Sequence, residues 1–152
     1  MPGISDIAAQ VIVAEIGVDT SRFPTSGHLV SWAGLCPRND ESAGKRCSTR
    51  VRKSANWLKI TLVTCAWAAV RTRDTYLRAQ FLRIKSRRGA KKAILAVAAS
   101  MITAAFHMLR AGIEYRDLGP DHLDRHDKTG TINRLMKRLQ DLGCPVDIPQ
   151  AT

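Results

Sequence analysis

The stretch AKKAILAVAASMITAAFHMLRA, residues 90–111, decides the fold. Its long run of alanines and larger apolar residues, followed directly by Gly112, predicts one continuous helix that ends at that glycine. Alanines allow neighbouring helices to approach closely, so we expect this helix to be the centre of a bundle. His107 lies on it, and we expect a packed core histidine rather than a metal ligand.

Apolar residues at helical spacing predict further helices on both sides. The expected helices run from Ser5/Asp6 to Gly17, over 27–33 with Ser26 as N-cap, over 54–72, from Asp74 to a break at 86–89, and over 131–142. The predicted fold class is therefore all-α, a compact helical domain. In the helix over 54–72 the expected core stripe is Leu58, Leu62, Cys65, Ala66 and Ala69, with Trp57 beside it. We expect the aromatic residues in the core rather than as base-stacking platforms.

The expected organisation is a single domain over 1–143 with a tail at 144–152. Its parts are a helix-hairpin-helix-like part (1–34), a basic loop with Ser42 (35–53), a helical core (54–112), and a loop with the last helix (113–143). The start, Pro2-Gly3-Ile4, resembles the turn of a helix-hairpin-helix unit, whose backbone N–H groups contact a DNA phosphate. An ordinary capped helix explains the same residues.

Positive charge is concentrated in one part of the chain. The net charge is +11, and residues 38–92 hold 16 Lys/Arg against 3 Asp/Glu, a local excess of +13. Such an excess predicts a polyanionic partner, most commonly nucleic acid. No charge-free apolar run reaches about 18–20 residues, and nothing resembles a signal peptide, so we expect a cytoplasmic protein without a membrane partner.

The spacing of the Cys, His and Asp residues predicts neither a metal site nor a disulfide framework. The cysteines, none in C-x-x-C spacing, are Cys36, Cys47, Cys65 and Cys144. The acidic and histidine residues of 117–127 that could suggest metal ligands are Asp121, His122, Asp124, His126 and Asp127. We favour a solvated connector there and expect no metal site.

Ser42 stands in the segment ESAGKR, residues 41–46. Small residues on one side of a serine let a backbone approach, and cations such as Lys45 and Arg46 would hold a polyanion, which suits attack on a phosphodiester. The alternative is a simple turn residue, which is the usual role of serine in such a run.

Seven blocks in register resemble one family. They read PGIS…AEIG, RFPTSGHLVSWAGLCP, ESAGKR, RKSANWL, DTYLRAQFLR, RRGAKKAILAVAASMITAAFHML and YRDLG-PDHLDR. This order is similar to that of the C-terminal transposase domain of insertion-sequence families one-ten and one-sixteen, the bridge-RNA-guided serine transposases. The resemblance covers nearly the whole chain.

The resemblance implies a function and partners. Family members use the serine at the position of Ser42 as nucleophile, forming a transient phosphoserine link to DNA. Their N-terminal RuvC-like domain supplies Mg²⁺ through a DEDD set of carboxylates, and we expect no cofactor on this chain itself. The implied partners are DNA, a guide (bridge) RNA, the RuvC-like domain and further protomers. The cytoplasmic location would then include the nucleoid.

The sequence departs from the family pattern in three places. No RuvC-like domain precedes the PGIS turn, so we expect the chain to be inactive alone. The usual RKG-[ND] becomes Arg52-Lys53-Ser54-Ala55-Asn56, and Ser5 replaces the second glycine of the turn.

Three hypotheses stay open: a recombinase domain that contributes Ser42, a non-catalytic nucleic-acid-binding remnant, and an unrelated RNA-binding protein of ribosomal type. The expected nucleic-acid contacts, each of which could instead be part of a solvated cationic face, are Lys45, Arg46, Arg50, Arg52, Lys53 and Lys59, with a second patch of Arg87, Arg88, Lys91 and Lys92.

Overall fold

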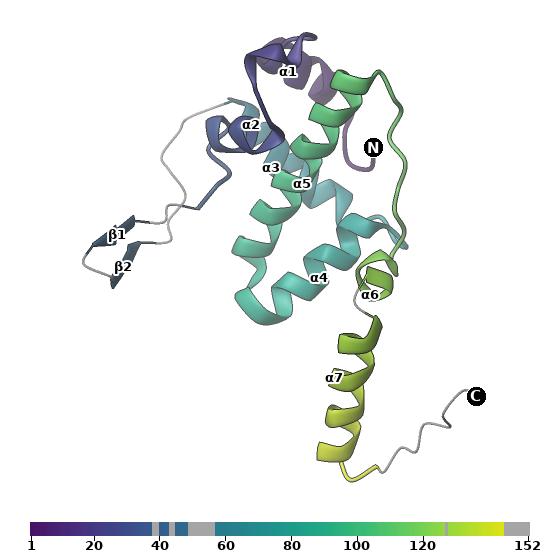
Figure 1. Cartoon of the computed structure of the whole chain (residues 1–152). Coiled ribbons are helices and arrows are strands. Elements are labelled where there is room, and N and C mark those ends of the chain that lie inside the picture. The colour runs from purple at the N-terminus through teal and green to yellow at the C-terminus, as the bar shows by residue number, and fades with distance from the viewer. Residues whose placement is uncertain (38–39, 43–44, 49–56, 127, 145–152) are drawn as a thin grey trace.

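The computed structural model describes residues 1–37, 40–42, 45–48, 57–126 and 128–144. Its elements are α1 (Asp6–Ile16), η1 (Thr20–Arg22), α2 (Ser26–Trp32), β1 (Asp40–Ser42), β2 (Lys45–Ser48), α3 (Trp57–Ala69), α4 (Tyr76–Arg88), α5 (Ala90–Ala111), α6 (His122–His126) and α7 (Lys128–Asp141) (Figure 1). Helices contribute most of the hydrophobic core, which confirms the all-α fold class. The chain also contains one small hairpin.

Helix α5 is the centre of the bundle, as predicted, with the predicted bounds. It contacts α2, α3, α4 and η1, and Figure 1 shows it running through the middle of the helical body. Gly112 ends the helix in the left-handed conformation (φ 63°) and donates its N–H to the Met108 carbonyl. The buried residues of α5 are Ala93, Ile94, Val97, Ala98, Met101, Ile102 and Phe106.

Helix α5 is also long and apolar enough to cross a membrane, the one such helix among the described residues. Its buried side chains and its contacts with α2, α3 and α4 are those of a core helix. His107 on the same helix is exposed, so the expectation of a packed core histidine is wrong. The histidine lies one residue beyond Phe106, on the outward side of the last turns.

Helix α1 begins and ends where the sequence predicts. The Ser5 hydroxyl oxygen accepts a hydrogen bond from the Ala8 N–H (3.3 Å), and Gly17 follows the last turn. The preceding turn packs against α3: a Cβ on Gly3 (φ +75°) would meet the Cys65 carbonyl oxygen and lie 2.5 Å from the Ala69 backbone nitrogen. Close packing therefore requires glycine here, and a phosphate contact by this turn stays a prediction.

The core stripe of α3 is confirmed, since all five expected residues are buried. Trp57 is 71% exposed, so its expected place in the core is wrong. Trp32 of α2 is 38% exposed, whereas Leu29 of the same helix is fully buried. The beginning of the predicted helix over 54–72 lies outside the described residues.

Several predicted boundaries were wrong for local reasons. Thr25, and not Ser26, caps α2, because its side-chain oxygen accepts from the His28 N–H (3.4 Å). Asp74 has φ 56° and stands before α4, which Thr75 caps. Helix α4 continues through 86–88 and ends only at Gly89 (φ 82°), since no other residue there leaves the helical region.

The C-terminal part is more helical than predicted. Helix α6 lies inside the stretch 117–127, which was expected to be a loop, and α7 begins at Lys128, three residues before the predicted start. No residue of α7 is buried. In Figure 1 this helix extends away from the body beyond α6, with which it is in contact.

Candidate nucleic-acid interface

The segment around Ser42, expected to be a loop, contains a hairpin. Strands β1 and β2 are antiparallel, and the register pairs Asp40 with Ser48, Glu41 with Arg46 and Ser42 with Lys45. Directly paired residues of antiparallel strands have Cα atoms about 4.5–5.5 Å apart. The backbone therefore brings two of the predicted site residues, Ser42 and Lys45, opposite one another.

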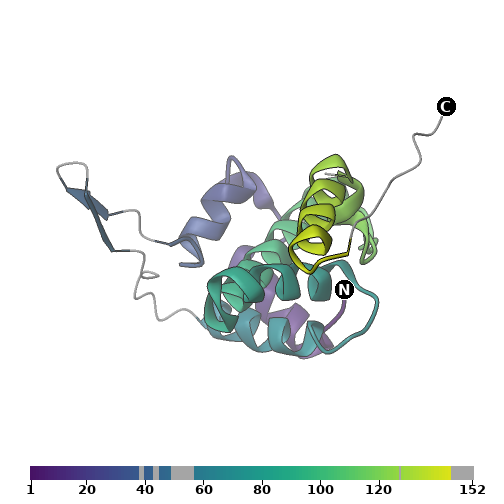
Figure 2. The same ribbon diagram turned by 90° about the horizontal axis from the view of Figure 1, so that it is seen from below.

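The rest of the first predicted set lies further along the chain. Arg50, Arg52 and Lys53 are outside the described residues. Lys59 is in the first turn of α3 and is half-buried. In Figures 1 and 2 the hairpin lies to one side of the helical body, away from α4 and α5.

The second predicted set lies together at the junction of α4 and α5. Gly89 separates the two helices, and the side chains on both sides of it are exposed. We call this surface the basic corner; its residues are Lys85, Arg87, Arg88, Lys91 and Lys92. Lys85 was not predicted, and the signal that could have found it is its place in the last turn of α4 with two arginines.

The electrostatics of the basic corner favour an anion. The sequence has no Asp or Glu between Asp74 and Glu114, so α4 and α5 themselves carry no carboxylate that would neutralise it. Cations at the end of α4 are favourable to its dipole, but Lys91 and Lys92 stand in the first turn of α5, where positive charge is unfavourable. Gly89 supplies no side-chain cap to that helix. A bound phosphate would offset the positive charge in the first turn of α5 and would accept hydrogen bonds from the uncapped N–H groups there.

Other cations of the basic segment have structural roles. Arg78 Nη1 donates to the carbonyl oxygens of Val70 (3.2 Å) and Arg71 (3.5 Å) at the end of α3. Arg83 Nη1 donates to the Leu123 carbonyl oxygen (3.4 Å) on α6. The excess charge of residues 38–92 is thus divided between helix ends and exposed surface.

The acidic and histidine residues of 117–127 make ordinary contacts. The His122 ring meets Tyr76 edge to face (centroids 5.5 Å apart), and Asp124 accepts from the Thr131 hydroxyl (3.4 Å). In the part of the chain that is described, no group of three or more His, Cys, Asp or Glu could hold a metal ion. His126 and Asp127 are not described at the side-chain level.

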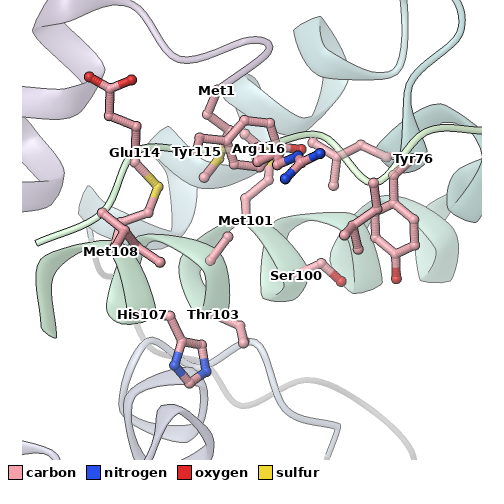
Figure 3. A pocket seen from close by; sticks show the side chains of 14 residues that line it. Met1, Tyr76, Ser100, Met101, Thr103, His107, Met108, Glu114, Tyr115 and Arg116 are labelled. Atoms are coloured by element: carbon pink, nitrogen blue, oxygen red, sulfur yellow. The ribbon is translucent and has the colours of Figure 1, made fainter. Parts of the chain in front are cut away.

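A cavity of about 490 Å³ lies between α5 and the extended residues 113–118. Figure 3 shows Met101, Met108 and Tyr115 around it, with His107 at its margin. Burial and a hydrogen bond to Asp117 raise the pKa of Tyr115 well above its ordinary value. The lining is mostly apolar, and its polar residues include Ser100, Glu114 and Arg116.

Asp117 anchors the segment that lines one side of this cavity. Its Oδ1 accepts from the Tyr76 N–H (3.0 Å) and the Gly119 N–H (2.8 Å), and its Oδ2 accepts from the Tyr115 hydroxyl (2.9 Å). Burial alone would raise the pKa of Asp117, but the hydrogen bonds outweigh it and hold the pKa below its ordinary value. No local sequence pattern indicates this role of Asp117.

Fold and charge together define a helical protein with a segregated cationic surface. Its first 82 residues match the model of the transposase IS116/IS110/IS902 family. The chain belongs to this family of insertion-sequence transposases, which confirms the resemblance and argues against an unrelated protein of ribosomal type.

A similar protein in Streptomyces coelicolor is an insertion element IS110 uncharacterized 43.6 kDa protein. It is 32% identical over 122 residues, which are 79% of this chain and 30% of the relative. The chain thus spans less than a third of the length of this curated relative. No solved structure matches the chain.

Proposed function

We propose that this chain is the part of an insertion-sequence transposase that binds DNA and guide RNA and supplies Ser42 as the nucleophile. The observation that carries the proposal is the pairing of Ser42 with Lys45 at the end of a hairpin. Membership of the transposase family supports it. The same family suggests a cytoplasmic protein, and action on DNA would place it at the nucleoid.

In the proposed reaction the Ser42 oxygen attacks a phosphorus atom of the DNA backbone. A bond from Oγ to phosphorus forms as the bond from phosphorus to a deoxyribose oxygen breaks, and the released oxygen takes up a proton. The phosphoserine ester conserves the energy of the phosphodiester, so a second strand can displace the serine without a nucleotide cofactor. Exchange between strands requires more than one protomer.

A serine hydroxyl is a weak nucleophile unless it is activated. Among the described residues no group of three or more His, Cys, Asp or Glu could hold a metal ion, and we assign activation to Mg²⁺ held by the RuvC-like domain that the family resemblance implies. The role of this chain is to hold the phosphate and to place the serine. Lys45, Arg46 and the basic corner are the proposed phosphate contacts.

The test is covalent trapping with the full chain, a RuvC-like domain, guide RNA, DNA and Mg²⁺. We expect a protein–DNA adduct that resists denaturation and disappears in Ser42→Ala. Ser48→Ala, in the other strand of the same hairpin, is the matched control and should keep the adduct. If the adduct persists in Ser42→Ala, or never forms with the native chain, Ser42 is not the nucleophile.

Nucleic-acid binding without cleavage is the second candidate function. The basic corner favours it, because an anion site between α4 and α5 does not depend on Ser42. Binding that is unchanged in Ser42→Ala, together with no adduct in the native chain, is the result that would select it.

A further inference from the structure

Helix α3 is apolar on both faces, although only one of them is buried. Its inner face packs against α1 and α5. Its outer face presents Trp57, Ile60 and Trp67, which are 71%, 57% and 42% exposed. A helix that is apolar all round is normally buried all round. We call the outer residues Trp57, Ile60, Thr64, Trp67 and Arg71 the tryptophan face.

The four of these residues that lie on α3, Trp57, Ile60, Thr64 and Trp67, follow one another at intervals of three and four, so they form one stripe along the helix, and Arg71 lies in the turn directly after it. The two indole rings are ten residues apart, which is about 15 Å along a helix axis. Trp67 is held edge to face by Phe81 (centroids 5.8 Å apart). The Thr64 hydroxyl donates to the Ile60 carbonyl oxygen (3.0 Å), so this hydroxyl needs no hydrogen-bond acceptor from a partner.

The charge around the tryptophan face indicates the chemistry of its partner. Helix α3 has no Asp or Glu. Lys59 stands near one end of the stripe, and Arg71, exposed, stands at the other with Arg73 close behind. Aromatic rings between cations suit a strand whose flat bases stack on the rings while its phosphates meet the charges.

We propose that Trp57 and Trp67 stack on unpaired bases of a single polynucleotide strand. This inference rests on the proposed function, because it presupposes that the chain binds nucleic acid. The proposed site on α3 binds an unpaired strand and not a duplex. It does so without sequence specificity, because every base can stack on an aromatic ring. Trp57, which is mostly exposed, provides the larger stacking surface.

The first experiment measures binding of the full chain to fluorescein-labelled single strands, (dT)₂₀ and (rU)₂₀, and to a DNA duplex, by anisotropy over a range of salt. We expect Trp57→Ala to weaken single-strand binding about tenfold, since one base–aromatic stack contributes roughly 5- to 150-fold. The duplex should lose little affinity. The salt slope should stay unchanged, because no phosphate contact is removed. Trp57→Phe should restore most of the affinity.

A second measurement uses tryptophan fluorescence of variants that keep one of the three tryptophans. The emission of Trp57, alone after Trp32→Phe and Trp67→Phe, should be quenched by (dT)₂₀. Trp32 is the matched control: it lies on α2 against Phe23 (ring centroids 5.5 Å apart), and its emission should change little. Because Trp57 is mostly exposed, its substitution should leave the helical circular dichroism intact.

The outcomes separate this inference from the proposed function. Salt-dependent binding that is equal in the native chain and Trp57→Ala would overturn the stacking site and leave nucleic-acid binding in place. No binding to any strand or duplex would overturn both. A change of sedimentation in Trp57→Ala, with unchanged nucleic-acid affinity, would assign the face to a protein partner instead. A loss confined to (dT)₂₀ or to (rU)₂₀ would identify the strand as DNA or RNA.

Discussion

At the scale of single residues, Asp117 links three points of the chain through its two carboxylate oxygens. We predict that Asp117→Asn lowers the free energy of unfolding by about 1–2 kcal/mol at neutral pH, because the amide replaces an acceptor oxygen with a donor and loses charge-assisted hydrogen bonds. Urea denaturation measures the change. Asp121→Asn, an exposed carboxylate four residues further on, should change stability by less than about 0.5 kcal/mol.

The same carboxylate predicts a pH dependence. Its folded pKa is below the ordinary value of 3.8, so its contribution is fully present above pH 3.8 and is lost as the pH falls through the folded pKa. The native chain and Asp117→Asn should therefore become more alike in stability only in that acid range. A difference that stays constant through the acid titration would contradict this.

At the scale of elements, α3 and α7 differ in what their leucines stabilise. Leu62 is fully buried in α3, whereas Leu135 on α7 is 53% exposed. We predict that Leu62→Ala lowers the free energy of unfolding by about 2–5 kcal/mol, and that Leu135→Ala changes it by less than about 0.5 kcal/mol. Thermal unfolding of the two variants gives the comparison. A large loss in Leu135→Ala would show that α7 packs against the body.

Sequence predicts an element best where local chemistry agrees with packing. Helix α5 was predicted to the residue, because Gly89 and Gly112 stop it at both ends. Trp57 could not be placed, since α3 has large apolar residues on both of its sides and no continuous polar face to show which side is outward. The hairpin was missed because the polar run 39–46 lacks the alternation of apolar and polar residues that indicates strands.

At the scale of the whole molecule, the basic corner should determine the salt dependence of nucleic-acid binding. We predict that Arg87→Gln with Arg88→Gln weakens binding to all sequences and reduces the salt slope by about one per lost phosphate contact. Lys137→Gln, an exposed cation on α7, is the control for net charge and should keep the slope. Anisotropy titrations over a range of potassium chloride measure both. Equal salt slopes in the native chain and both variants would show that the basic corner makes no phosphate contact.

The sequence predicted where positive charge is concentrated. It did not predict which cations bond to carbonyl oxygens within the protein and which are exposed on its surface. Arg78 and Arg83 belong to the same basic segment as Arg87, yet they bond to carbonyl oxygens of other elements. Nothing in the local sequence separates these roles, because each depends on which helix end lies beside the side chain. The family resemblance predicts Ser42 as the nucleophile, which stays a prediction, and the backbone register pairs it with Lys45, which the sequence had also predicted.

The packing of Gly3 against Cys65 and Ala69 has a consequence during synthesis. Helix α1 buries its apolar side partly on α3, which a ribosome makes about fifty residues later. At about 5–20 residues per second, α1 waits several seconds for that partner with Ile12 and Ile16 uncovered. The nascent chain therefore offers a binding site for a chaperone during that interval, and translation speed through the basic segment sets how long it lasts.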